Sequence, residues 1–87
     1  MTHYVEIKDF SFHPSELTIS VGDGVVWQNK DSMNHTATRI DNPAFDTGPI
    51  PSNTDSNATI FNKASDKSGF DYYCKPHPFM KGKIVVS

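Results

Sequence analysis

Short runs of β-forming residues separated by turn-forming residues are the feature that most restricts the fold of this sequence. Apolar side chains do not recur three and four positions apart in any window of roughly eleven residues or more, so helices are at most minor. β-branched and aromatic residues instead gather in about seven predicted strands, at residues 4–7, 16–20, 25–27, 36–40, 58–61, 70–73 and 83–86. Turn-forming residues occupy the connections, as in Gly22-Asp23-Gly24 and Ser68-Gly69. The pattern predicts an all-β sandwich or barrel.

The length of the chain, 87 residues, allows one compact core and no second one, so we expect a single domain over residues 1–87. Leu17 and Ile19 alternate with polar residues, which is typical of a strand with one face in a core and the other in water. Residues 42–57, rich in Asn, Pro, Asp and Ser, form the longest irregular stretch, and we expect a surface loop there.

Charge and hydropathy exclude two classes of partner. The net charge is −2 and the eight Lys and Arg residues are scattered, so the sequence lacks the clustered positive charge that binds nucleic acid. No apolar run approaches the roughly 20 residues of a membrane helix, so no membrane insertion is expected. Residues 1–4 lack the basic and apolar pattern of a signal peptide, so we expect a soluble or already processed chain.

The single cysteine, Cys74, points to a metal site. One cysteine cannot form an internal disulfide, so a bound metal is the expected alternative means of stabilising a domain of this size. Cys74, His77 and Met80 place a thiolate, an imidazole and a thioether at the spacing Cys-x2-His-x2-Met. Thiolate and thioether favour Cu(I), imidazole also suits Cu(II), and two His, one Cys and a weak axial Met form a blue-copper site. The segment therefore lacks only one more histidine.

The second histidine must come from another part of the chain, because one short loop cannot surround an ion. His35, at the start of a predicted strand, is the best-placed candidate. The predicted strands on either side of the loop put Cys74 and Met80 near its rims and His77 near its tip. A proline on each side of His77 restricts the backbone, so we expect the loop to resist rearrangement when the metal changes oxidation state.

The pattern extends beyond these four residues and resembles the cupredoxins, the family of type 1 blue copper proteins. Residues 12–19 and 21–29 are similar to the family's second and third strands, and His35 falls at the place of its remote ligand. The segment Cys74-Lys75-Pro76-His77-Pro78-Phe79-Met80-Lys81-Gly82 resembles the short ligand loop of amicyanins, whereas plastocyanins have longer spacings. Thr36 departs from the family, which often has an Asn there that ties the two copper-binding loops together by hydrogen bonding, so we expect its hydroxyl to fill that role less completely.

The resemblance implies a Greek-key β-sandwich of about seven to eight strands with one type 1 copper near one end. It assigns the ligands to His35, Cys74, His77 and Met80, and it implies a carrier that passes one electron through His77 to redox partners docking transiently around it. The expected patch comprises Met33, Pro49, Pro51, Pro76, Pro78 and Phe79, with Lys75 and Lys81 beside it. A monomer in the periplasm or another extracytoplasmic compartment is expected.

Electron transfer is favoured over catalysis because four protein ligands leave copper no position for a substrate, and no acid-base group accompanies them. A copper carrier or storage protein stays open as an alternative, and it requires ligand exchange with a partner and a more accessible site. Zinc also suits Cys and His, but it generally takes a stronger fourth ligand than a thioether. Met1, Thr2 and His3 either wrap a second Cu(II) through amine, amides and imidazole or form a chain end that binds nothing.

Overall fold

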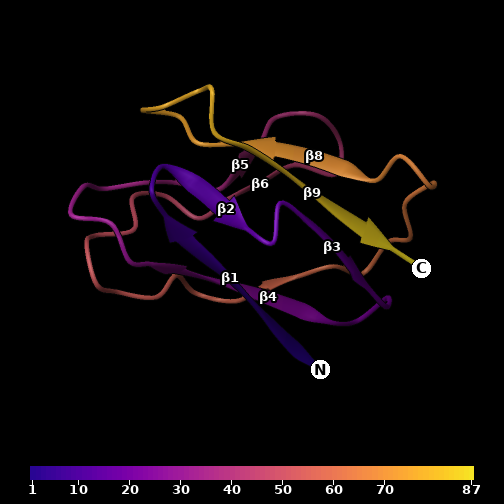
Figure 1. Ribbon diagram of the computed structural model, residues 1–87. Helices are drawn as coiled ribbons and strands as arrows, with labels where there is room; N and C mark the ends of the chain where they lie inside the picture. The colour runs from indigo at the N-terminus through magenta and orange to yellow at the C-terminus, as the bar shows by residue number, and fades with distance from the viewer.

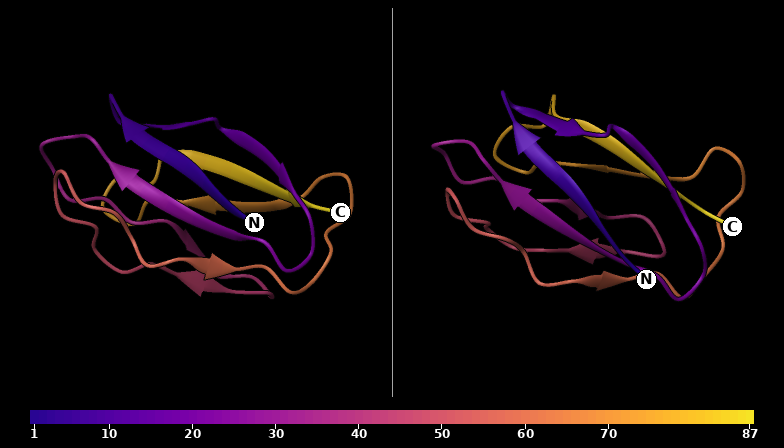
Figure 2. Two further views of the ribbon diagram at one scale, coloured as in Figure 1. Left: turned by 90° about the horizontal axis from the view of Figure 1, so that it is seen from below. Right: turned by 60° about the horizontal axis from the view of Figure 1, so that its bottom comes forward.

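The computed structural model describes residues 1–87 and contains nine strands and no helix, hence none long and apolar enough to cross a membrane (Figure 1). The strands are β1 (Thr2–Lys8), β2 (Ser11–His13), β3 (Glu16–Ile19), β4 (Gly24–Asn29), β5 (Thr38–Arg39), β6 (Phe45–Asp46), β7 (Thr59–Ile60), β8 (Phe70–Tyr73) and β9 (Lys81–Val86). One sheet has the order β2-β1-β4-β7 and the other β3-β9-β8-β5-β6. Figure 2 shows β1 and β4 side by side in one layer, with β9 in the layer behind them.

The all-β sandwich predicted from the sequence is confirmed. Each of the seven predicted strands overlaps an observed one, but the stretch 36–40 contributes only Thr38–Arg39 to a strand. Two short strands, β2 and β6, lie outside the predicted ones. Phe10 and Phe12 alternate with polar residues and predict a half-buried stretch there, and Phe12 of β2 is buried. β6 contains one apolar residue, Phe45, which is too few for an alternation to show.

Residues 42–57 are largely irregular and lie at the surface, as their composition predicts, but two features depart from a simple loop. They contain β6, and the side chain of Ile50 is buried, with only 2% of the residue exposed. The N–H of Ile50 donates to the carbonyl of His35 at 2.7 Å, and the N–H of His35 donates to Ile50 at 3.3 Å. A lone apolar residue in a polar stretch has no periodicity to reveal its burial. The pairing fixes the backbone on which His35 is carried.

The core between the two sheets is apolar and centres on Trp27. The indole Nε1–H of Trp27, in β4, donates to the hydroxyl of Tyr72, in β8, at 3.1 Å and so joins the sheets. Tyr72 also packs edge-on against Phe12, with ring centroids 4.7 Å apart, and burial raises its pKa. Gly82 lies opposite Tyr72 in the β8–β9 pair, and a Cβ there would overlap the Tyr72 ring. The aromatic ring therefore depends on this glycine for its space.

The turn between β1 and β2 has an unusual backbone. Only Asp9 and Phe10 form it, and both have positive φ, 54° and 55°. Such a turn matches the twist of a two-stranded hairpin, but a bulky residue at positive φ is strained. The carboxylate of Asp31 accepts the N–H groups of both turn residues, at 2.8 and 3.0 Å. Asp31 thus holds the strained turn from a different part of the chain.

Candidate metal centre

Three of the four predicted ligands converge at one end of the sandwich. His35 lies between β4 and β5, Cys74 directly follows β8, and His77 lies in the loop from β8 to β9. Their donor atoms all lie within 4.8 Å of one another, with the Cys74 Sγ 3.5 Å from the His35 Nδ1 and 3.8 Å from the His77 Nδ1. His35 and Cys74 are fully buried, whereas His77 is partly exposed. Access from solvent to this cluster is therefore through His77.

The chemistry of these donors fits copper. A thiol and two imidazole nitrogens converge with no carboxylate among them, which disfavours the hard cations Ca²⁺ and Mg²⁺. The backbone N–H of Thr36 donates to the Cys74 Sγ at 3.4 Å, a contact that fixes the position of the sulfur. Two imidazoles and a thiolate also suit zinc. The three residues alone therefore define a soft metal site but do not select between the two metals.

Met80 is buried at the end of the same loop. The N–H of Cys74 donates to the carbonyl of Met80 at 3.1 Å, and the N–H of Met80 donates to the carbonyl of His77 at 2.9 Å. These two bonds close the loop into a compact turn between β8 and β9. The role of Met80 as axial ligand stays a prediction.

Asp31 supports His35 from the side opposite Cys74, a contact that the sequence patterns did not single out. The His35 Nε2 lies 2.9 Å from the Asp31 Oδ2, and because a carboxylate only accepts, the imidazole donates and its Nδ1 keeps a free lone pair toward Cys74. Partial burial would raise the pKa of Asp31, but the N–H groups of Phe10 and Asp9, with His35, outweigh it and lower that pKa. Asp31 therefore stays ionised and fixes the tautomer that can bind a metal.

Phe10 forms an aromatic cover over both histidines. Its ring lies edge-on to His35, with centroids 5.2 Å apart, and edge-on to His77, with centroids 4.9 Å apart. The ring of Phe79 stacks on Phe10 at 6.4 Å and lies 6.2 Å from His77. Phe10 is thus placed at the metal centre by the strained turn that Asp31 holds. A single Phe in a two-residue turn carries no sequence signal of such a role.

Thr36 links the two copper-binding segments through its side chain and its backbone. Its Oγ1 accepts the backbone N–H of Lys75 at 2.9 Å, while its own N–H points at the Cys74 Sγ. One residue beside the remote histidine therefore contacts both the ligand loop backbone and the ligand sulfur.

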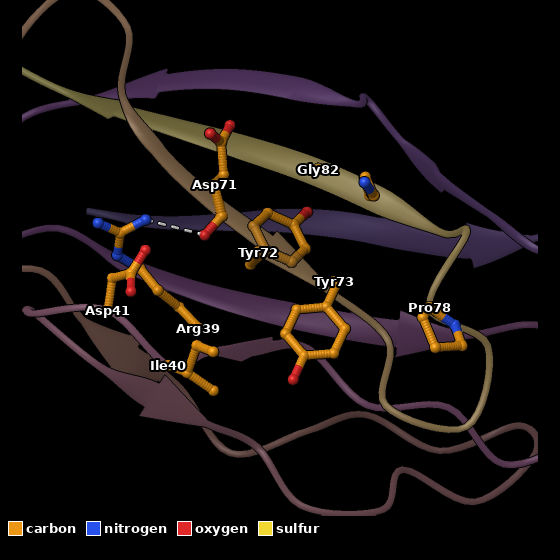
Figure 3. Close-up of a pocket in the computed structure, with 9 residues that line it drawn as sticks. Arg39, Ile40, Asp41, Asp71, Tyr72, Tyr73, Pro78 and Gly82 are labelled. Carbon is orange, nitrogen blue, oxygen red and sulfur yellow. Dashed lines mark hydrogen bonds between the residues drawn. The ribbon is translucent and has the colours of Figure 1, made fainter.

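Two surface depressions adjoin the loop from β8 to β9. One, of about 810 Å³, is lined by His77 together with Met33, Pro49, Lys75 and Pro76, all members of the predicted docking patch. The other, of about 550 Å³, contains none of the three converging ligands (Figure 3). Two residues predicted for the patch, Pro78 and Lys81, line this second depression together with the side chains Arg39, Ile40, Asp41, Asp71, Tyr72 and Tyr73. The predicted patch is therefore divided between two surfaces.

His3 does not approach the converging ligands. It lies in β1, which pairs with β4, and its Nε2 is 2.9 Å from the Asp23 Oδ2. An N-terminal Cu(II) site would have to take the imidazole away from that carboxylate.

Comparisons with known proteins identify the metal. The family model for copper binding proteins of the plastocyanin/azurin family matches residues 1–87. Amicyanin of Paracoccus denitrificans is 34% identical over 85 residues, which cover 94% of this chain and 63% of the relative. Amicyanin-alpha of Methylorubrum extorquens is 34% identical over 82 residues, which cover 94% of this chain and 69% of that relative. A solved structure of a reduced amicyanin variant has a TM-score of 0.89 at 29% identity and covers 99% of this chain and 82% of its own.

The fold and the donor set define a cupredoxin, and the chain belongs to the plastocyanin/azurin family of copper-binding proteins. Copper is accordingly the cofactor, and the buried His35, Cys74 and partly exposed His77 fit a type 1 site. The chain spans 63% of the length of the Paracoccus denitrificans relative.

Proposed function

We propose that this protein carries single electrons between redox partners by means of one type 1 copper. The residues that would hold the copper in this proposal are His35, Cys74, His77 and Met80, the last as the weakest of the four donors. The convergence of a buried thiol and two imidazole nitrogens within 4.8 Å is the observation that carries it. When bound, copper supplies the one-electron change between Cu(I) and Cu(II).

The part of the protein itself is to keep the donors in one geometry. Asp31 orients His35, Thr36 donates to the sulfur of Cys74, and prolines flank His77. A donor set that does not relax toward the preference of either oxidation state loses little energy in reorganising when an electron moves. This arrangement leaves no open position for a substrate, so it supports electron carriage rather than catalysis.

Electrons enter and leave through His77 in this proposal, because it is the one converging ligand that solvent reaches. Met33 and Pro49 give its depression apolar walls, and Phe79, with its ring centroid 6.2 Å from that of His77, is 69% exposed. An apolar surface of this kind suits a partner that binds transiently and excludes water at the contact. We place the protein outside the cytoplasm and expect a monomer.

The spectrum of the protein loaded with Cu(II) tests the proposal. A type 1 site gives an intense thiolate-to-copper band in the visible range and a narrow copper hyperfine splitting in EPR. Both are expected in the wild type and lost in Cys74→Ala. His13→Ala is the matched control, because the His13 Nε2 contacts the Lys8 carbonyl and lies outside the donor cluster. A weak spectrum that Cys74→Ala leaves unchanged would place copper elsewhere and reject the proposal.

The copper carrier or storage alternative predicts a different kinetic behaviour. A carrier gives its copper to a chelating acceptor rapidly, whereas an electron carrier keeps it and exchanges electrons between Cu(I) and Cu(II) molecules. The burial of His35 and Cys74 favours the second. Copper loss to a chelator that is faster than electron self-exchange, measured on the same sample, would favour the carrier.

A further inference from the structure

A closed ring of hydrogen bonds lies beside Cys74. The N–H of Lys75 donates to the Thr36 Oγ1 at 2.9 Å, and the Thr36 Oγ1 lies 2.9 Å from the Thr38 Oγ1. The Thr38 hydroxyl donates to the Asp46 Oδ1 at 3.1 Å, and the ammonium of Lys75 donates to the Asp46 Oδ2 at 2.6 Å. The ring begins and ends at Lys75, the residue that follows the cysteine ligand.

Three of the four hydrogen bonds in this ring run in one direction, from the Lys75 N–H to Asp46, and the Lys75 ammonium donates to the same carboxylate from the other side. The single hydroxyl proton of Thr38 goes to the Asp46 carboxylate, which only accepts, so Thr36 must donate to Thr38. Thr36 in turn accepts the Lys75 N–H, and the result is one uninterrupted chain from that N–H to the carboxylate. Hydrogen bonds aligned in this way polarise one another, most strongly where the groups are buried, as both threonines are.

The backbone makes the ring possible. Thr36 and Thr38 are two positions apart, and Thr38 is paired with Asp46 in the β5–β6 ladder, which sets hydroxyl and carboxylate side by side. The hydrogen bond from Lys75 lowers the pKa of Asp46, which is therefore held ionised. Three segments distant in sequence are thus tied together: the stretch after His35, the strand β6 and the ligand loop.

We propose that Thr38 and Asp46, acting through Thr36 and Lys75, are positioning residues for the copper site. They fix the start of the ligand loop, at Lys75, relative to His35, and so set where the sulfur of Cys74 lies. The expected effect on copper binding rests on the proposed copper function, whereas the ring of hydrogen bonds is observed independently of that function. Each part can therefore be tested separately.

Copper affinity tests the consequence. Thr36→Val keeps the shape of the side chain but removes the acceptor for Lys75 and the donor to Thr38, so Cu(I) affinity should fall at least about tenfold in competition with a chelator. Thr36→Ser keeps the hydroxyl group and should therefore retain most of the wild-type Cu(I) affinity. Thr47→Val is the matched control, because the Thr47 Oγ1 accepts the N–H of Ala37 at 3.0 Å and belongs to no part of the ring.

Amide hydrogen exchange of the copper-free protein tests the ring directly. Asp46→Ala should speed the exchange of the Lys75 amide by about tenfold, which corresponds to the loss of one ordinary hydrogen bond. Asp71→Ala also removes a surface carboxylate near a lysine, Lys83 at 3.9 Å, and should leave the Lys75 amide unchanged. Circular dichroism of each variant establishes that the sandwich is intact.

The outcomes separate the two ideas. Equal Cu(I) affinity in the Thr36→Val, Thr36→Ser and wild-type proteins overturns the positioning role. Equal Lys75 exchange in Asp46→Ala and Asp71→Ala overturns the ring. A wild-type protein that lacks the type 1 spectrum but shows the Asp46-specific change in exchange would refute the copper function while the ring stands.

Discussion

The centre of the sandwich and its metal end are held together in different ways. The centre is apolar, and Trp27, Phe12 and Tyr72 pack there with one hydrogen bond between the sheets. The metal end is tied by side chains that bond to distant backbone groups, as Asp31 does to the β1–β2 turn and Thr36 to the ligand loop. The centre therefore determines whether the chain folds, and the metal end determines how the donors are placed. Substitutions in the two regions should be separable by measuring stability and copper affinity independently.

Trp27→Ala should have the largest effect and act on folding. It removes the largest buried side chain and leaves the Tyr72 hydroxyl without its donor, so the copper-free protein should lose about 3–5 kcal/mol of unfolding free energy. Urea unfolding followed by circular dichroism measures this loss. Trp27→Phe is the control and should lose less, because it keeps much of the ring. A loss below about 1 kcal/mol for Trp27→Ala would contradict the central role of this residue.

Gly82→Ala should destabilise the fold by about 1–3 kcal/mol through overpacking against Tyr72. The same unfolding measurement in the background of Tyr72→Val should show a much smaller penalty, because the ring that meets the added methyl group is gone. Equal penalties in the two backgrounds would show that the effect of the alanine does not come from this contact.

Asp31→Asn should act at the metal end. The amide can still fill the space, but it no longer fixes the His35 tautomer or accepts with a full charge, so Cu(II) affinity should fall roughly 10- to 100-fold. Competition with a chelator measures the affinity, and urea unfolding of the copper-free protein should change far less than for Trp27→Ala. Asp41→Asn removes the same charge from an exposed site and should leave the affinity unchanged. If Asp31→Asn lowered the free energy of unfolding but left the copper affinity unchanged, Asp31 would act on the stability of the fold and not on the metal site.

Acid should weaken the fold through Asp23, which lies in the turn between β3 and β4. The contact with His3, and then the N–H of Ser20, lower the pKa of Asp23 from 3.8 to about 2. A carboxyl group with a lower pKa in the folded chain stabilises it above pH 3.8, and this contribution is lost as the pH falls toward 2. The urea midpoint of the copper-free protein should therefore fall over this range, and less steeply in Asp23→Asn. Parallel curves for the two proteins would contradict the shift.

The sequence predicted the all-β class and most of the strands because these depend on local patterns of apolar and turn residues. It also placed Cys74, His77 and Met80 in one loop, since their spacing is itself local. His35 was identified by its position before a predicted strand, and the structure brings it to the cysteine. The complete ligand set remains a prediction for the spectra to test.

Tertiary structure alone decided what surrounds the donors. Nothing local in residues 42–57 shows that Ile50 pairs with His35, and nothing in the β1–β2 turn shows that Phe10 will cover two histidines. The link from Thr36 to Lys75, which the family resemblance suggested but no local pattern shows, joins positions 39 residues apart. Such contacts arise when two sheets pack and bring distant segments into register, and they leave no periodic trace in the segments themselves. The sequence by itself therefore determined which donors are available, and the packing of the sheets decided how they are held.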